Sequence, residues 1–250
     1  MEFVSPEIFA LLIGVAVLAG LVDAIAGGGG LLALPALLWA GVPPLQALAT
    51  NKLQGSFGTA TAAFHHARRG IIDPRRMLPQ VAWTFAGAAA GTLAVQHLVA
   101  AWLHALVPLL LILFAIYFLF SPRIGDADAQ ERISPALFGL LVGFGVGFYD
   151  GFFGPGTGTF FAAGFVLLLG WNLKRATAGT KLLNFTSNIA SLLFFAAAGQ
   201  VVWSIGLGMG LGQIVGAWIG SHLVLRHGSA LIRPLLVTVS ILISLRLLFG

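Results

Sequence analysis

The stretch GLVDAIAGGGG, from Gly20 to Gly30, places an aspartate one helical turn before four consecutive glycines, within an otherwise apolar segment. The stretch GFYDGFFGPGT, from Gly147 to Thr157, repeats this arrangement with Asp150 at the position of Asp23. Glycine is a poor helix former and adopts backbone angles that other residues avoid. We therefore expect each stretch to break a helix directly after its aspartate.

The segments that follow the two glycine stretches are also alike. GVPPLQALATNK (Gly41 to Lys52) aligns with GWNLKRATAGTK (Gly170 to Lys181), so that both segments end on a lysine. The order of aspartate, glycine stretch, lysine, glycine and histidine is kept in both halves, which indicates an internal duplication. We predict a first repeat at residues 1–120, a linker at 121–134 and a second repeat at 135–250.

The composition excludes an ordinary water-soluble protein. Hydrophobic residues make up 58% of the chain and charged residues 8%, with a mean hydropathy of +0.98, whereas about 25% of the residues of a soluble domain are charged. We predict an all-α, polytopic transmembrane protein with about eight to ten membrane segments. The apolar pieces are residues 6–26, 31–41, 45–67, 76–98, 102–120, 135–153, 157–170, 175–198, 201–225 and 230–249.

The second piece of each half, 31–41 and 157–170, falls short of the ~20 residues that a full crossing needs. These two pieces are expected to be half-helices or strongly tilted spans, each opened by its glycine stretch.

Basic residues predict how the halves lie in the membrane. Arginines cluster in the loop at 68–76, whereas the equivalent loop at Gly199 and Gln200 is uncharged; conversely, Lys174 and Arg175 have uncharged counterparts in the first half. Because basic loops stay in the cytoplasm, equivalent loops are expected on opposite sides and the repeats are predicted to be inverted. The linker is then cytoplasmic and both termini are external.

Four charged residues fall well inside apolar segments: Asp23, Lys52, Asp150 and Lys181. A charge at bilayer depth costs at least ~2.5 kcal/mol, so such residues are candidates for function. The aspartates could carry protons that couple transport, and the lysines could bind an anion. The alternative is structural, with each aspartate pairing with a lysine to fix the helix packing.

The glycine stretches suggest a second contribution to an anion site. A helix that starts after such a break presents unpaired N–H groups and the positive end of its dipole, and two such ends near the midplane would bind an anion. The alternative is close packing of small residues between spans. The candidate binding residues here are Gly27, Gly28, Gly29, Gly30, Gly154, Gly156 and Thr157.

Small and polar residues follow each lysine at helical spacing. Ser56 and Thr59 lie four and seven residues after Lys52, and Asn184 and Asn188 lie three and seven residues after Lys181. Residues so spaced share a helix face, and we predict that the four polar residues line a hydrated pathway. Immediately before the lysines, Asn51 and Thr180 could donate hydrogen bonds to a substrate, although helix contact explains them nearly as well.

The residue inventory narrows the partners. The chain has no cysteine, its 13 Lys and Arg are scattered and not gathered into a basic face, and its histidines lack the spacing of a buried metal site. We therefore expect no metal, no cofactor and no nucleic acid as partner. The expected partners are a small anion and the lipid bilayer, with self-association into a homo-oligomer left open.

At these residues the sequence resembles the sulfite exporter TauE/SafE family of membrane permeases. The resemblance is carried by the duplicated segment at Asp23 to Gly30 and by ATNK at Ala49 to Lys52, echoed by AGTK at Ala178 to Lys181. It implies a multi-pass protein of the bacterial inner membrane that exports sulfite or related sulfur-containing anions, organosulfonates included.

The leading interpretation is therefore a transporter that works by alternating access at the repeat interface, and not an enzyme. An anion channel with the same site is one alternative. Another is an intramembrane aspartyl protease in which Asp23 and Asp150 share a proton, but that reading leaves Lys52 and Lys181 unexplained.

Overall fold

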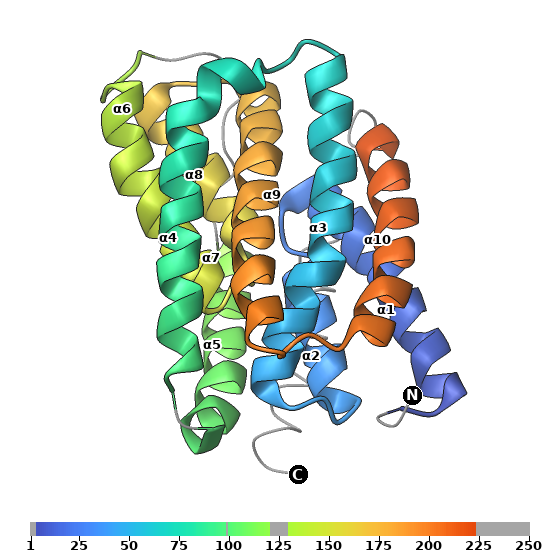
Figure 1. The fold of residues 1–250 in the computed structure, drawn as a ribbon. Coiled ribbons are helices and arrows are strands. Elements are labelled where there is room, and N and C mark those ends of the chain that lie inside the picture. The colour runs from blue at the N-terminus through green and yellow to red at the C-terminus, as the bar shows by residue number, and fades with distance from the viewer. Residues whose placement is uncertain (1–3, 99, 121–129, 224–250) are drawn as a thin grey trace.

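The computed structural model describes residues 4–98, 100–120 and 130–223, and within these ranges the regular structure is entirely helical (Figure 1). The prediction of an all-α protein is therefore confirmed. The last predicted piece, 230–249, and residues 121–129 of the predicted linker lie outside the described ranges.

The helices follow the predicted pieces closely. In the first half they are α1 (Pro6–Ala26), α2 (Gly30–Trp39), α3 (Pro44–Arg68), the short 3-10 helix η1 (Pro74–Met77), α4 (Leu78–Gln96) and α5 (Ala100–Phe120). In the second half they are α6 (Pro135–Phe138), the π-helix η2 (Gly139–Phe144), α7 (Gly145–Phe152), α8 (Thr157–Leu169), α9 (Leu173–Ala197) and α10 (Trp203–Leu223).

Local sequence explains where these helices begin and end. The Ser5 side chain accepts a hydrogen bond from the Ile8 amide at 3.4 Å and Pro6 occupies the first helical turn, so α1 starts there. It ends at Gly27, whose φ of 75° lies in the left-handed region. The predicted half-helices are present as α2 and α8, with 10 and 13 residues.

Two long helices, α3 and α9, occupy the centre of the bundle (Figure 1). In the view of Figure 1, α3 runs upward and α9 runs downward, although both follow a short helix in the sequence. Helix α1 packs against α10, and α7 packs against α4. Each of these pairs joins one helix of the first half to one helix of the second, so the halves are interleaved.

Glycines allow these helix pairs to approach closely. Gly147 of α7 faces the backbone of α4, and a Cβ added there would lie 2.6 Å from the carbonyl oxygen of Thr84. Gly212 of α10 faces α1 in the same way, 2.7 Å from the carbonyl oxygen of Ile13. Small residues at helix contacts are typical of membrane bundles, where dispersion contacts between backbones replace the hydrophobic effect.

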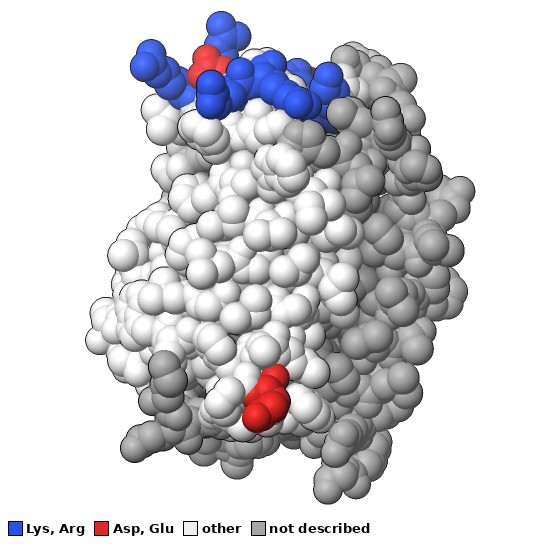
Figure 2. Space-filling view, turned by 90° about the vertical axis from the view of Figure 1, so that its right-hand side faces the viewer, with Lys and Arg blue, Asp and Glu red and all other residues white. Residues whose placement is uncertain are grey.

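The outer surface has the charge distribution of a protein in a bilayer. Figure 2 shows Lys and Arg side chains at one end, above a broad surface without basic side chains. Many large apolar side chains are exposed, among them Leu18, Phe64 and Trp102. The exposed basic residues of the described ranges, which we call the cationic rim, are Arg68, Arg69, Arg75, Arg76, Arg132, Lys174 and Arg175.

Two stretches of the described residues, Pro6–Ala24 and Pro135–Phe152, are long and apolar enough to cross a membrane by themselves. Helices α2 and α8 are apolar but shorter. Helix α3, although it runs much of the height of the molecule in Figure 1, carries buried polar side chains that lower its hydropathy. The predicted number of membrane segments stays a prediction.

Candidate functional site

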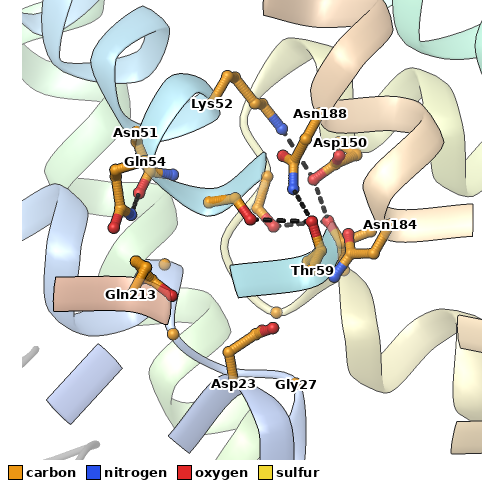
Figure 3. Close-up of a pocket in the computed structure, with 16 residues that line it drawn as sticks. Asp23, Gly27, Asn51, Lys52, Gln54, Thr59, Asp150, Asn184, Asn188 and Gln213 are labelled. Carbon is orange, nitrogen blue, oxygen red and sulfur yellow. Dashed lines mark hydrogen bonds and ion pairs between the residues drawn. The ribbon is translucent and has the colours of Figure 1, made fainter. Parts of the chain in front are cut away.

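A polar cavity lies inside the bundle where both glycine breaks meet the central helices (Figure 3). Its volume is about 40 Å³. A site needs roughly 10–15 Å³ to hold one water molecule, so this cavity holds a few waters or one compact ion. It is lined by Asp23, Gly27, Gly29, Gly30, Asn51, Lys52, Gln54, Gly55, Thr59, Asp150, Gly154, Gly156, Thr157, Asn184, Asn188 and Gln213.

Lys52 and Asp150 form a buried ion pair at the edge of this cavity. The Lys52 Nζ lies 2.9 Å from Asp150 Oδ1, and the two residues are 1% and 2% exposed. The Thr157 hydroxyl donates a hydrogen bond to the same carboxylate oxygen at 2.7 Å. A buried charge without a partner is strongly unfavourable, so this pair holds α3 of the first half to the break between α7 and α8 of the second.

Lys181 and Asp23 form the second pair, with Nζ 3.0 Å from Asp23 Oδ2. Lys181 also donates to the main-chain oxygen of Asp23. The lysine side chain is 2% exposed and does not line the cavity, whereas the Asp23 side chain is 15% exposed and does. The two pairs are reciprocal, because the lysine of each half binds the aspartate of the other half.

This pairing is the arrangement that the structural alternative predicted for the aspartates. Neither lysine is a free cation, since each ammonium has a carboxylate within 3.0 Å. Asp23 and Asp150 are each bound to a lysine and do not form a carboxyl pair with one another, which disfavours the arrangement that an aspartyl protease needs.

Glycine conformation creates the two breaks. Gly27 has φ 75°, and Gly154 and Gly156 have φ 100° and 86°, so all three occupy the left-handed region. Gly29, in contrast, has φ −55°. It packs closely against α1, because a Cβ added at Gly29 would lie 2.8 Å from Asp23 Cβ. In the second break the Tyr149 hydroxyl donates to the carbonyl of Pro155.

The breaks direct two helix N-termini at the cavity. Helix α2 begins at Gly30 and α8 begins at Thr157, and both residues line the cavity. No side chain caps either N-terminus. Backbone carbonyls of the breaks accept hydrogen bonds from the Leu31 and Thr157 amides. What the two N-termini direct at the cavity is therefore the positive end of each helix dipole.

Neutral amides and hydroxyls supply the rest of the lining. Gln54 Nε2 donates to Asn51 Oδ1 at 2.8 Å, and Asn188 Nδ2 donates to Thr59 Oγ1 at 3.4 Å. In Figure 3, Asn51, Gln54 and Gln213 lie on one side of the cavity and Thr59 and Asn188 on the other. Such groups both donate and accept hydrogen bonds, which suits a polar ligand without adding charge.

The structure places most of the predicted site residues around this one cavity, but not all. Gly28 and Lys181 do not line it, nor do Thr180 and Ser56. The Ser56 hydroxyl instead donates to the Lys52 carbonyl at 2.7 Å, and Thr180 is buried in α9. The predicted residues that line the cavity are Asp23, Gly27, Gly29, Gly30, Asn51, Lys52, Thr59, Asp150, Gly154, Gly156, Thr157, Asn184 and Asn188.

Sequence reasoning missed Gln54 and Gln213, which are 1% and 3% exposed and line the cavity. The available signal was the cost of an amide at membrane depth. Gln213 is the one carboxamide side chain in the glycine-rich sequence of α10, and Gln54 lies one turn after Asn51 in α3.

Comparison with known proteins supplies the family. A sequence model of the sulfite exporter TauE/SafE family matches residues 12–247. The chain is 46% identical to a probable membrane transporter protein, ORF9, of Sinorhizobium sp., over 99% of this chain and 95% of the relative. It is 48% identical to the probable membrane transporter protein YfcA of Escherichia coli K12, over 98% and 91% of the two chains.

A probable membrane transporter protein of Haemophilus influenzae is 43% identical over 97% of this chain and 95% of its own length. No solved structure matches the chain. The family match covers both glycine breaks, both buried ion pairs and the helices that surround the cavity. The chain therefore belongs to the sulfite exporter TauE/SafE family of membrane transporters.

Proposed function

We propose that this protein exports small anions across the bacterial inner membrane, with sulfite or related sulfur-containing anions, organosulfonates included, as its substrates. The observation that carries the proposal is the cavity, at which two uncapped helix N-termini meet a buried lysine and several amides. The family name and the transporter names of the relatives support transport as the activity. The size of the cavity favours a compact substrate.

The proposed mechanism is alternating access at the interface of two inverted repeats, 1–120 and 135–250, joined by a cytoplasmic linker at 121–134. Three observations support it. The two ion pairs are reciprocal between the halves. Helices α3 and α9 run in opposite directions (Figure 1). Thr59 and Asn188, which occupy equivalent positions seven residues after their lysines, contact each other, as residues on a twofold axis do.

Export of an anion has a ready source of energy. A membrane potential that is negative inside favours the exit of each negative charge by ~2.3 kcal/mol per 100 mV. The sequence contains no phosphate-binding loop of the GxxxxGK[ST] type. We therefore propose that the potential drives export, with no chemical step on the chain itself.

The test is anion flux in liposomes that contain the purified protein. The assay uses sulfite, sulfate, thiosulfate and methanesulfonate, and we expect at least one of the sulfur anions to cross faster than in protein-free liposomes. Lys52→Met should lower the flux, because it removes the cation at the cavity and leaves Asp150 unpaired. Lys174→Met, which changes an exposed lysine of the cationic rim, is the matched control and should leave the flux unchanged.

Counterflow separates the transporter from the channel. Unlabelled substrate on the far side accelerates the entry of labelled substrate through a carrier, because the loaded site returns to the near side. A channel with the same cavity shows no such acceleration. Absence of flux for every anion in the panel would remove the proposed function.

A further inference from the structure

Two buried acceptor atoms belong to side chains that line the cavity. Asp150 and Gln54 are 2% and 1% exposed, and both residues line it. Within the part of the chain that the structure describes, no group donates a hydrogen bond to Asp150 Oδ2 or to Gln54 Oε1. Nearly all buried polar atoms of proteins have a partner, because without one the loss of contact with water is not offset. A ligand of the cavity can supply the missing donors.

The carboxylate of Asp150 is used on one side only. The Lys52 ammonium lies 2.9 Å from Oδ1, and the Thr157 hydroxyl donates to the same oxygen at 2.7 Å. Both donors therefore approach one oxygen and leave Oδ2 to another group. An ionised carboxylate accepts hydrogen bonds and donates none. Oδ2 is thus suited to an N–H or O–H group and repels the bare oxygen atoms of an anion.

Gln54 belongs to a pair of amides on the other side of the cavity from Asp150 (Figure 3). Its Nε2 donates to Asn51 Oδ1 at 2.8 Å. Two carboxamides joined by one hydrogen bond keep one carbonyl oxygen and several N–H groups for other partners, whichever of the two is the donor. The amide pair therefore offers a ligand both donors and an acceptor.

Resting on the proposed function, we infer that the cavity binds an anion that carries its own hydrogen-bond donor, an N–H or O–H group beside its acceptor oxygens. The donor lies toward Asp150 Oδ2, and a second N–H or O–H of the ligand has Gln54 Oε1 as its acceptor. The oxygens of the anion lie toward the Lys52 ammonium and the amide N–H groups. Hydrogen sulfite in its hydroxyl form has such a donor, whereas sulfite and methanesulfonate have none.

The volume of the cavity selects the probes for a test. About 40 Å³ corresponds to roughly three water molecules, which fits an anion built on one sulfur atom. Sulfamate and methanesulfonate are two such anions. They have the same charge, the same three oxygens and nearly the same size, but sulfamate has an amino group where methanesulfonate has a methyl group. A difference in their binding therefore reports the amino group.

The first test measures the unfolding temperature of the purified protein with each anion at equal ionic strength, with chloride as the reference salt. A ligand that binds only the folded state raises its stability according to its affinity. We expect sulfamate to bind roughly tenfold or more tightly than methanesulfonate, as a hydrogen bond to a charged acceptor provides. Equal binding, or tighter binding of methanesulfonate, overturns the inference. This comparison needs no variant.

The second test replaces the acceptor. In Asp150→Asn the side-chain oxygen stays with the donors Lys52 and Thr157, so the new NH₂ group takes the position of Oδ2 and cannot accept. The preference for sulfamate over methanesulfonate should fall or reverse. Asp73→Asn makes the same chemical change at a side chain that is 51% exposed and far from the lining, and should leave the preference unchanged.

A second variant keeps the ion pair intact. Gln54→Met preserves the length of the side chain and removes Oε1, so one of the two acceptors for the amino group is lost. The preference for sulfamate should fall here as well. A preference that is unchanged in both Asp150→Asn and Gln54→Met contradicts the inference.

These outcomes separate the inference from the function on which it rests. If sulfamate and methanesulfonate bind and cross equally well, the protein is an anion transporter and only the requirement for a donor is wrong. If no anion binds or crosses, the proposed function itself fails.

Discussion

At the scale of single residues, each of the two buried lysines forms an ion pair with an aspartate. Sequence reasoning found all four charged residues from the cost of a charge at membrane depth. It offered aspartate–lysine pairing as an alternative but could not tell which lysine meets which aspartate, because helical spacing relates residues along one helix. Lys52 and Asp150 lie on different helices of different halves. The same limit explains why Gln213 was missed, since it reaches the cavity from α10 with no motif around it.

Removing one partner of a buried ion pair should destabilise the protein more than removing both partners. Lys52→Met leaves the Asp150 carboxylate buried without its counter-ion, which typically costs about 3–5 kcal/mol. The double variant Lys52→Met and Asp150→Asn leaves no unpaired charge and should recover most of that loss. The unfolding temperature of the purified protein measures both.

The control for this pair is Arg76→Met, which removes a partner of Asp73 in a pair at 3.5 Å whose side chains are 89% and 51% exposed. Solvent screens exposed pairs, so little change is expected. A single variant at Lys52 that is as stable as the parent would show that the buried pair does not hold the halves together.

Two glycines of the second break provide a matched comparison. Gly154→Ala adds a Cβ 2.8 Å from Lys52 Nζ at a residue with φ 100°, whereas Gly156→Ala adds a Cβ with no atom within 4 Å at φ 86°. Both substitutions destabilise the protein by about 1 kcal/mol or more, because alanine is strained at a positive φ. Only Gly154→Ala also displaces the ion pair. We therefore predict that Gly154→Ala lowers both stability and flux more than Gly156→Ala does.

The unfolding temperature and the sulfite flux of the two variants check this comparison. Equal effects on both quantities would mean that Gly154 serves the turn alone and that its contact with Lys52 has no consequence.

At the scale of the elements, the boundaries of the helices were the most predictable feature. Piece 6–26 corresponds to α1 (Pro6–Ala26) because a serine cap, a proline and a glycine mark its ends. Piece 76–98 is less accurate, since the Asp73 side chain first caps the short helix η1 and α4 begins only at Leu78. The π-helix η2 was not predicted, because an apolar run with this periodicity does not distinguish wide turns from α-helical turns.

Two glycines of α7 test the role of glycine in the contact between helices. Gly147→Ala places a Cβ 2.6 Å from the Thr84 carbonyl oxygen and should force α7 away from α4, so that the unfolding temperature falls. Gly145, two residues earlier, has nothing within 4 Å of an added Cβ. Gly145→Ala should be neutral or stabilising by up to about 1 kcal/mol, because alanine favours a helix over glycine.

A fall of similar size in both variants would assign the effect to helix propensity and not to contact with α4. The two glycines lie within one helical turn, but Gly145 is exposed and Gly147 is buried against α4, so the comparison isolates the contact between the helices.

At the scale of the whole molecule, the inverted arrangement makes a prediction about the two sides of the membrane. Arg69 follows α3 and Ala198 follows α9 at equivalent positions, and both residues are exposed. In Figure 1 these helices end at opposite ends of the bundle. The natural chain has no cysteine, so Arg69→Cys and Ala198→Cys each introduce one reactive thiol.

A maleimide that does not cross membranes should label Ala198→Cys in intact cells and Arg69→Cys only after the cells are opened. Labelling of both from the same side would contradict the inverted repeat. The sequence predicts the duplication. It does not predict the contacts of α1 with α10 and of α4 with α7, because these join residues far apart in the chain.

The reciprocal ion pairs have a consequence for biosynthesis. The partner of Asp23 is Lys181, which lies 158 residues later in the chain. The partner of Lys52 is Asp150, which also belongs to the second half. While the ribosome is still making the second half, the first half holds an acid and a base without the partners that each has in the finished protein. Neither half can form its buried ion pairs alone, so we expect the protein to complete its folded state only after the second half has been made.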